Sequence, residues 1–360
     1  MKIKDICTSV TDGSHNPPQG IEKSEYMMLS SKNIFDDEIT FDEPRFLSEK
    51  DFEREHKRTQ IAVGDVLLTI VGTVGRTAVV DEDMPAFALQ RSVAVLHPKN
   101  DVCLPRFLMY ALRGKRTYIE NRAKGVAQKG IYLKEVSDID IYIPDISNQE
   151  IIINKLDKVN TIIKLRQEEL LALDNLIKAQ FVEMFGDPVS NSYGFPEATL
   201  PELGELGRGV SKHRPRNDSK LLGGDYPLIQ TGDVANAGLY ITSYGGTYSE
   251  LGLKQSKMWN KGTLCITIAA NIAKTAILEF DACFPDSVVG FIANEKTNNI
   301  FIHYWFSFFQ AILESQAPES AQKNINLKIL SELKVIVPKK EKQDEFVEFI
   351  EQVYKSKVTV

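Results

Sequence analysis

Hydrophobic residues form two similar series of short runs, one in each half of the chain, with a differently spaced series between them. In each half, runs of Val, Ile, Leu and Thr are separated by Gly, Asn, Asp and Pro, which is typical of a mostly β domain with long loops. Apolar residues recur at helical spacing over Pro105–Arg122 and again near Ile300–Ser315, so each half also contains a helix. We expect His303, Trp305 and the Phe residues of the second helix to pack in a core rather than to form an exposed stacking platform.

The two halves are repeats of one another. Four short blocks recur in the same order at an offset near 195 residues, and the last two blocks share an offset of 194. The matching blocks are Tyr26–Ser30 with Tyr226–Gln230, Gly64–Ile70 with Gly262–Ile268, Gln128–Ile131 with Gln322–Ile325, and Ile141–Pro144 with Val335–Pro338. Agreement in order and spacing indicates an internal duplication, so the 360 residues are expected to form two domains of one kind.

A long helix is predicted between the repeats. Ser147 and Glu150 have the spacing of a capping box, which places the helix start at about Asn148, and no Gly or Pro follows before Gly186. A helix running to about Phe185 would be about 55 Å long at 1.5 Å per residue. Its apolar residues keep the spacing of a coiled-coil seam, which is broken only by Arg166. The seam residues are Ile152, Leu156, Val159, Ile163, Leu170, Leu173 and Ile177.

A second and shorter helix is predicted after the second repeat. The pattern restarts over Lys342–Lys357 with Phe346, Ile350 and Val353. We expect this helix to pair antiparallel with the long one, because the long seam otherwise lacks a partner. The alternative, a surface helix that packs on its own domain, remains open at this point.

Composition restricts the class of protein. A hydrophobic content of 43% and a charged content of 26% are ordinary for a folded chain, and no apolar segment follows Met1 or approaches the length of a membrane span. We therefore expect a cytoplasmic protein. The four cysteines and five histidines are scattered without metal-ligand spacing, so we expect buried free thiols, no metal and no cofactor.

The net charge of −6 hides two local basic clusters. A negative total argues mildly against a nucleic-acid partner, because proteins that bind nucleic acids neutralise phosphates with Lys and Arg. The first cluster is Arg113, Lys115, Arg116, Arg122, Lys124, Lys129 and Lys134, and the second is Arg208, Lys212, Arg214, Arg216 and Lys220. These clusters predict either two basic binding surfaces or solvated loops without a partner.

The order of domain, long helix, domain and helix resembles the specificity subunit of type I restriction-modification systems over essentially the whole chain. Three strings carry the resemblance: Thr11–His15 as an entry loop, Gly64–Leu67 as a central strand and Phe181–Pro188 as the exit from the spacer. The resemblance implies an α+β protein, with two similar mostly-β target-recognition domains joined by long α-helices that pair as an antiparallel coiled coil. We place the first recognition domain at 1–146, the spacer helix at 147–186, the second recognition domain at 187–340 and the short second spacer helix at 341–360.

The resemblance also implies a function without catalysis. Each domain is expected to read one half of a split, asymmetric sequence in double-stranded DNA. The helices are expected to set the separation of the halves and to dock two methyltransferase (modification) subunits that carry adenine-N6 methylation, which restriction subunits can join. In that family the second spacer helix is about as long as the first, and here it is much shorter, which puts symmetric docking in doubt.

Candidate DNA-binding residues were chosen as donors and acceptors on predicted loops, because bases are read by directional side chains. In the first domain they are Ser14, His15, Asn16, Gln19, Lys32, Arg76, Gln90, Arg91 and Lys129. In the second domain they are Lys212, His213, Arg214, Arg216, Thr231, Asn271, Lys274, Lys323 and Asn324. Phosphate contact is the expected role of the lysines.

Three weak catalytic motifs are set aside. Asn16–Gln19 lacks the aromatic residue that completes the Asn-Pro-Pro signature of amino-methyltransferases, and Gly72–Thr77 lacks the first glycine and the lysine of a phosphate loop. Pro285 and Asp286 are not followed by the Glu-x-Lys of a nuclease site. The alternatives that remain are a two-domain non-catalytic scaffold, the specificity subunit of a methylation-only system, and a self-contained nuclease or methyltransferase.

Overall fold

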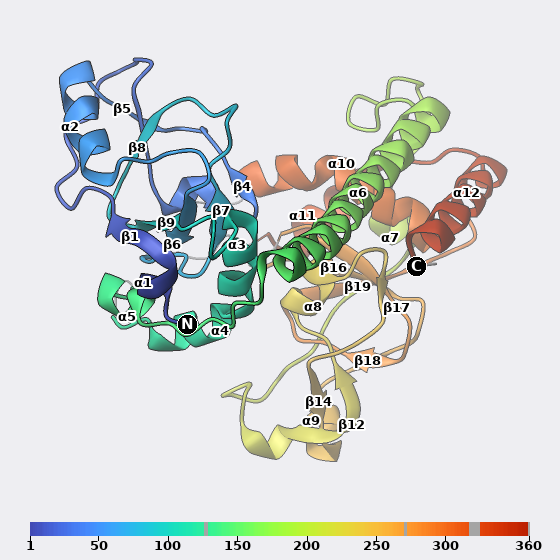
Figure 1. Ribbon diagram of the computed structural model, residues 1–360. Coiled ribbons are helices and arrows are strands. Elements are labelled where there is room, and N and C mark those ends of the chain that lie inside the picture. The colour runs from blue at the N-terminus through green and yellow to red at the C-terminus, as the bar shows by residue number, and fades with distance from the viewer. Residues whose placement is uncertain (126–128, 270–271, 317–324, 359–360) are drawn as a thin grey trace. The chain divides into compact units, whose positions relative to one another are not determined.

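The structure is a computed structural model that describes residues 1–125, 129–269, 272–316 and 325–358 (Figure 1). Its contacts divide the chain into two compact units, unit 1 (Met1–Leu165) and unit 2 (Arg166–Val360). The long helix α6, Ile146–Phe185, contributes its first residues to unit 1 and its last residues to unit 2.

Unit 1 is built on a four-stranded antiparallel sheet, and helix α3 lies against its strands β6 and β7 (Figure 1). The strands, in the order β1-β9-β6-β7, are Cys7–Asp12, Val93–Pro98, Val66–Thr69 and Thr77–Val79. A second sheet has the order β5-β2-β8 (Arg45–Phe46, Met27–Leu29, Phe87–Leu89), and β3 (Ile34–Phe35) pairs with β4 (Glu38–Ile39). The helices besides α6 are α1 Ile3–Ile6, η1 Ser31–Asn33, α2 Glu49–Thr59, α3 Pro105–Gly114, α4 Arg116–Arg122 and α5 Leu133–Ser137.

Alternate residues of strand β6 face two different hydrophobic cores. Val66 and Leu68 pack in a core that includes Phe107 of α3, whereas Leu67 packs in a core that includes Leu29 of the second sheet. All four residues of β6 are buried. Because both faces of the sheet are covered, the strand reads as a continuous apolar run rather than as an alternation of apolar and polar residues.

Unit 2 repeats this plan with one more strand in its main sheet. The main sheet, in the order β11-β19-β16-β17-β13, consists of Gly204–Arg208, Val288–Ala293, Leu264–Thr267, Thr275–Leu278 and Tyr240–Ile241. The second sheet, in the order β14-β12-β18-β15, consists of Gly246–Tyr248, Leu222–Leu228, Ala282–Cys283 and Met258–Trp259, while β10 (Glu197–Thr199) pairs with β20 (Lys334–Ile336). The helices are α7 Leu200–Leu203, η2 Ser219–Leu221, α8 Thr231–Asn236, α9 Glu250–Lys254, α10 Asn299–Gln316, α11 Leu327–Glu332 and α12 Lys340–Val358.

The duplication predicted from the sequence is confirmed in the backbone. Strands β11, β19, β16 and β17 have the order and antiparallel pairing of β1, β9, β6 and β7. Gly64 and Gly262, at corresponding turns before β6 and β16, have φ of 89° and 88°, a conformation that favours glycine. Their N–H groups donate to the carbonyls of Val80 and Leu278 at 2.9 and 2.8 Å, so the same turn closes the same hairpin in both units.

The two helices predicted beside the sheets are present, with one correction. The segment Pro105–Arg122 is two helices, α3 and α4, because Lys115 between them leaves helical geometry at φ −98° and ψ 7°. Helix α10 is continuous. Phe301 and Trp305 of α10 are fully buried, which confirms that the aromatic residues of this helix pack in the core.

Helix α6 begins two residues earlier than predicted and ends at Phe185 as predicted. The Asp145 carboxylate accepts a hydrogen bond from the backbone N–H of Asn148 at 2.9 Å, so an aspartate caps the first turn where we expected a box formed by Ser147 and Glu150. Gly186, with φ of 69°, follows the last turn. Forty residues make a helix about 60 Å long.

Helix α12 packs antiparallel on the part of α6 that belongs to unit 2, which confirms the predicted pairing there. The ring of Phe346 in α12 lies 5.3 Å from Phe181 and 5.7 Å from Phe185 in α6. Eleven residues further along α12, the carbonyl of Lys357 accepts a hydrogen bond from Arg166 at 2.9 Å. Ile177 of the predicted seam is buried in the same core, together with Phe346, Ile350 and Val353.

The seam prediction is wrong for the first half of α6. Leu156, Val159 and Ile163 are 36%, 50% and 49% exposed, whereas Leu170 and Leu173 are half-buried. Ile152 is also half-buried and packs against the core of unit 1. The reason is that α12 pairs with the later turns of α6, and within the described residues no apolar surface covers the intervening ones.

We predict that Phe181→Ala lowers the free energy of unfolding of unit 2 by about 3 to 5 kcal/mol, because the ring lies between Phe301 and Phe346 and its loss leaves a cavity. Urea denaturation followed by tryptophan fluorescence measures this, since Trp259 and Trp305, the two tryptophans of the chain, both lie in unit 2. Val182→Ala, next to it but exposed, is the control and should change stability by less than about 0.5 kcal/mol. Equal midpoints for the two variants would show that the aromatic cluster does not hold the helices.

Candidate nucleic-acid interface

Backbone hydrogen bonds bring three loops of unit 1 together at one end of its main sheet. The N–H of Ser14, after β1, donates to the carbonyl of Leu89 at 2.7 Å, and the N–H of Arg91 donates to the carbonyl of Ser14 at 2.9 Å. The N–H of Gln90 donates to the carbonyl of Leu29 at 2.9 Å. The loops that follow β1, β2 and β8 are therefore held in a fixed arrangement.

Two further loops join the same arrangement. The N–H of Ser31 donates to the hydroxyl of Ser92 at 3.0 Å, and the hydroxyl of Thr73 donates to the carbonyl of Ser31 at 3.4 Å. The N–H of Gly72 donates to the carbonyl of Lys129 at 3.0 Å. Candidate residues chosen from distant parts of the sequence thus come from loops that the fold links to one another.

A threonine shapes the hairpin loop of this surface in both units. In unit 1, the hydroxyl of Thr69 accepts a hydrogen bond from the N–H of Arg76 at 2.9 Å. In unit 2, the hydroxyl of Thr267 accepts one from the N–H of Lys274 at 3.1 Å. Arg76 and Lys274 therefore occupy corresponding positions, each at the end of a hairpin loop whose path is set by a buried side chain.

A hollow of about 480 Å³ lies beside the hairpin loop of unit 1. It is lined by Gly72, Thr73, Val74, Arg76, Arg116, Glu120, Asn121, Ala123 and Lys129. The guanidinium of Arg76 lies over the ring of Phe35, 4.9 Å from its centroid, so the aromatic face limits the orientations that this cation can take.

Unit 2 has a hollow of about 430 Å³ beside the start of its own hairpin loop, at Ile268 and Ala269. Ile325 donates through its N–H to the carbonyl of Ile268, just as Ile131 donates to Ile70 in unit 1. The hollow is lined by Arg208, Arg216, Ile268, Ala269, Asp286, Ser287, Ile325 and Asn326. In each unit, two arginines line a hollow next to the hairpin loop.

Asp286 gathers the arginines of the unit 2 hollow. Its carboxylate lies 2.5 Å from a guanidinium nitrogen of Arg216 and 3.5 Å from one of Arg214, and its backbone carbonyl accepts a hydrogen bond from Arg208. The side chains of Arg214 and Arg216 are about half exposed. Positively charged groups are therefore held together at the surface by one aspartate, with donors left over for a ligand.

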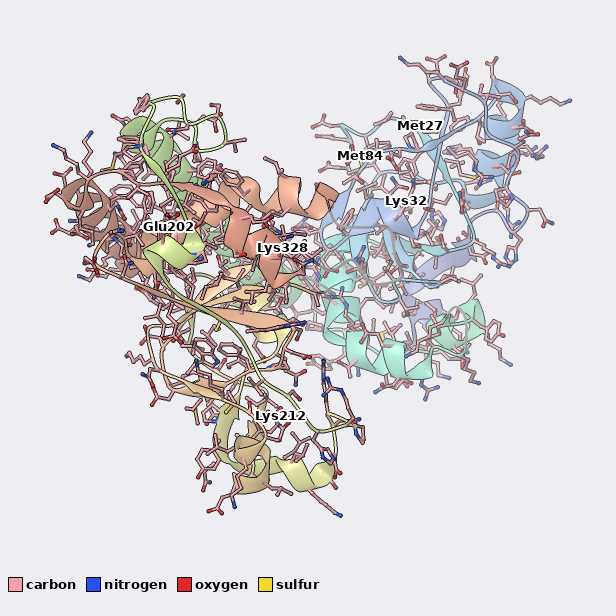
Figure 2. The ribbon with its side chains drawn as sticks, turned by 180° about the vertical axis from the view of Figure 1, so that it is seen from behind. Met27, Lys32, Met84, Glu202, Lys212 and Lys328 are labelled. Carbon is pink, nitrogen blue, oxygen red and sulfur yellow. The ribbon has the colours of Figure 1, made fainter. Side chains whose placement is uncertain are left out.

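The candidate residues of unit 1 differ in how accessible they are. His15, Asn16, Gln19, Lys32, Arg91 and Lys129 are exposed, and Arg76 and Gln90 are half-buried. Figure 2 shows the exposed side chain of Lys32, which lies 3.6 Å from the carboxylate of Glu43. Ser14 is only 4% exposed, which argues against a direct contact to any ligand; its backbone instead fixes the loop around it.

The candidate residues of unit 2 fall into three groups. Lys212, His213, Arg214 and Arg216 are exposed, Thr231 and Lys274 are half-buried, and Asn271, Lys323 and Asn324 lie outside the described residues. Lys212, labelled in Figure 2, lies on the loop next to α9, where its N–H donates to the carbonyl of Gln255. Lys328, labelled in the same figure, lies away from this loop.

The first basic cluster is partly neutralised, which the sequence did not indicate. Arg116 donates to the carboxylate of Asp36, and Arg113 lies 3.8 Å from it. Burial alone would raise the pKa of Asp36, but the hydrogen bond from Arg116 and the charges of both arginines outweigh it and hold that pKa below its usual range. Lys115 and Arg122 of this cluster lie over the ring of Tyr118.

The candidate residues did not include several polar residues that line the hollows, among them Arg116, Asn121, Arg208, Asp286, Ser287 and Asn326. Arg116 and Arg208 were noted only as members of basic clusters. Their basic side chains gave a signal, but the groups that hold them, the carboxylate of Asp36 and the backbone carbonyl of Asp286, are distant in the sequence. Asp286 was noted only as a weak nuclease motif, and it lies beside the arginines instead.

The structure does not place the three weak catalytic motifs in a catalytic setting. Gly72–Thr77 connects two strands, β6 and β7, where a phosphate loop would lead from a strand into a helix. The carbonyl of Pro18, in the Asn-Pro-Pro segment, accepts a hydrogen bond from Arg45 at 2.8 Å.

Among the described residues no group of three or more His, Cys, Asp or Glu could hold a metal ion. The four cysteines are buried free thiols, as expected. No helix in the described part of the chain is long and apolar enough to cross a membrane.

Comparison with known proteins gives a family match over most of the chain. The model of the type I restriction modification DNA specificity domain matches residues 1–175 and 197–360. The chain is 22% identical over 359 residues to the putative type I restriction enzyme MjaX specificity subunit of Methanocaldococcus jannaschii, covering 95% of this chain and 83% of that protein.

Two further proteins are similar. The type I restriction enzyme EcoBI specificity subunit of Escherichia coli is 26% identical over 186 residues, which is 50% of this chain and 38% of that protein. The crystal structure of the type I restriction-modification system S subunit from M. genitalium superimposes with a TM-score of 0.55 at 14% identity, covering 100% of this chain and 91% of that one. This structural likeness supports the fold.

We predict that Arg116→Gln raises the pKa of Asp36, because the charged hydrogen bond is lost while burial remains. In the unchanged protein, the stability contributed by this pair is present above about pH 4 and is lost as pH falls through the lowered pKa. A carbon NMR titration of the Asp36 carboxyl measures the shift. Arg122→Gln, which removes a cation beside Tyr118, is the control; an equal shift in both variants would mean that Asp36 responds to total charge rather than to Arg116.

Proposed function

The chain belongs to the family of type I restriction modification DNA specificity domains, and on that basis we propose that it is the subunit with which a type I restriction-modification complex recognises a split, asymmetric DNA sequence. Each unit reads one half of the sequence through the loops around its hollow. Methylation of adenine at N6, and cleavage where a restriction subunit is present, belong to partner subunits. The proposed work takes place on double-stranded DNA in the cytoplasm.

The observation that carries the proposal is that both units shape the hairpin loop with the same hydrogen bond, Thr69 with Arg76 and Thr267 with Lys274, and that one continuous helix, α6, belongs in part to each unit. Two copies of one reader on a continuous helix suit a target made of two parts. For this function we place the recognition domains at 1–146 and 187–340, the spacer helix at 147–186 and the second helix at 341–360.

Charge differences between the units support an asymmetric target. Asp12 of unit 1 pairs with the second residue of β9, and Arg208 of unit 2 pairs with the second residue of β19. The two residues therefore occupy corresponding positions. Two residues before those strands, unit 1 has Arg91 and unit 2 has Asp286. Opposite charges at two corresponding positions mean that the two surfaces present different donors and acceptors, so they favour different half-sites.

The side chains divide into two expected roles. Arg76, Arg91, Arg214 and Arg216 offer paired donors that match the acceptors of guanine in the major groove. Lys32, Lys129 and Lys212 are exposed point charges suited to phosphates, which supply most of the salt-dependent affinity. The net charge of −6 is compatible with binding because these cations lie on a few loops rather than over the whole surface.

Exposed apolar residues of α6 supply a docking surface for the methyltransferase subunits. Leu156, Val159, Ile162, Ile163 and Leu165 are exposed within three turns of the helix. A contiguous apolar surface of this kind usually marks a protein contact. A non-catalytic scaffold would also use it, and the distinction between the two is sequence-selective binding of DNA.

We expect co-expression with its modification subunit to produce N6-methyladenine at one split motif in a host that lacks adenine methylation. Single-molecule genome sequencing reads the motif, its two halves and the number of base pairs between them. Neither protein should methylate when expressed alone. Methylation by this chain alone would identify a self-contained methyltransferase, and co-purification without any selective DNA binding would favour the scaffold.

Arg214→Ala combined with Arg216→Ala should weaken DNA binding and reduce the slope of log affinity against log salt by about 2, because two phosphate or base contacts by cations are lost. A salt titration of the assembled complex by fluorescence anisotropy measures both quantities. Lys339→Ala combined with Lys342→Ala removes the same charge from exposed positions at the start of α12 and is the matched control. An unchanged slope in the arginine variant would remove these residues from the interface.

A further inference from the structure

A fully buried glutamine joins the first turn of α6 to the body of unit 1. Gln149 is 0% exposed, and its side-chain amide donates to the carbonyls of Val102 at 2.9 Å and Pro144 at 2.8 Å. Its side-chain oxygen accepts a hydrogen bond from the N–H of Leu104 at 2.9 Å. One side chain therefore links the helix, the segment before the helix and the loop before α3.

The same junction recurs 194 residues later. Gln343, in the first turn of α12, is also 0% exposed, and its amide donates to the carbonyls of Lys296 at 3.1 Å and Pro338 at 2.9 Å. Its side-chain oxygen accepts a hydrogen bond from the hydroxyl of Thr297 at 2.9 Å. Lys296 and Pro338 correspond to Val102 and Pro144, so the two bonds that the glutamine amide donates are the same in both units, while its oxygen accepts from a backbone N–H in unit 1 and from a hydroxyl in unit 2.

Three directional bonds restrain a helix in a way that apolar packing does not. Apolar contact tolerates small rotations and slides, whereas a buried amide with both hydrogens and its oxygen bonded loses stability when its partners move. A tilt of about 5° at the first turn would move the far end of a 60 Å helix by about 5 Å, which exceeds the rise of one base pair, about 3.4 Å. A small change of angle at the junction would therefore move the far end of the helix by more than the rise of one base pair.

We propose that Gln149 and Gln343 are positioning residues, and that they thereby restrict which spacing between half-sites the protein accepts. Gln149 fixes the angle at which α6 leaves unit 1, and Gln343 fixes the position of α12, whose Phe346 packs against the last turns of α6. This inference rests on the proposed function and deepens it. Neither glutamine touches DNA in this proposal: base contacts choose the half-sites, and the glutamines select the distance between them.

The alternative is that the glutamines only stabilise the junction. In unit 1 that junction has further support, since the carboxylate of Asp157 on α6 accepts hydrogen bonds from Arg106 at 2.6 Å and Tyr110 at 2.5 Å. With this second attachment, loss of the Gln149 bonds should loosen the first turn without releasing the helix. A purely stabilising role predicts less folded protein with an unchanged choice of spacing.

The test is Gln149→Met in the full chain, co-expressed with the modification subunit and read by single-molecule sequencing of N6-methyladenine. Methionine keeps the length and volume of the side chain and removes the three hydrogen bonds. We expect unchanged half-sites, with methylation at spacings one base pair longer or shorter rising about tenfold relative to the preferred spacing. Gln167→Met, an exposed position on the same helix, is the matched control and should leave the ratio unchanged.

Two outcomes separate this inference from the proposed function. If the unchanged chain methylates no split motif, the proposed function fails. If it does methylate one, and Gln149→Met lowers methylation equally at every spacing, the residue is structural and the inference is overturned.

Gln343→Met makes the same change at the second junction and keeps the test decisive where Gln149→Met folds poorly. A broadened spacing with either variant, at a thermal midpoint that shows folded protein, supports the inference. The inference is overturned if Gln343→Met is folded and keeps the original spacing while Gln149→Met either folds poorly or also keeps the original spacing.

Discussion

Burial of both faces of the central strands is the constraint on which the rest of this structure depends. In β6 and β16 alternate residues enter two different cores, so within the part of the chain that the structure describes neither face of these strands is open to a ligand. Polar recognition groups can then occupy only the loops at the strand ends. The same constraint makes those loops precise, because they leave rigid strands and are tied to each other by backbone hydrogen bonds.

The helices extend this rigidity beyond the domains. Gln149 and Asp157 bind the first turns of α6 to unit 1, while Phe181 and Phe185 bury its last turns in unit 2. Between them the helix keeps unbroken hydrogen bonding and exposes apolar residues. A segment that is anchored at both ends and exposed between them suits the spacer and docking roles that we propose for it.

Carboxylates hold the arginines of both units in place without occupying all of their hydrogen-bond donors. Asp286 gathers Arg214 and Arg216, and Asp36 orients Arg116, yet each guanidinium has more donors than its partner occupies. Such pairs lose little side-chain entropy when an acceptor arrives, because the arginines are already ordered. The overall negative charge also limits nonspecific attraction to DNA, so recognition depends on these few ordered groups.

Periodicity and repetition in the sequence were enough to predict the two-domain plan, the duplication, the long helix ending at Phe185 and the antiparallel packing of the second helix. These features follow from local spacing or from similarity of segments, which a linear chain displays directly. They were not enough to predict which part of the helical seam is buried, because that depends on how far α12 extends along α6. Nor could they reveal that Asp36 pairs with Arg116, that Asp286 gathers three arginines, or that Gln149 and Gln343 close equivalent junctions. Those contacts join groups that lie tens of residues apart, as Gln343 and Lys296 do, and their energies arise only when folding removes the groups from water and brings them within hydrogen-bonding distance.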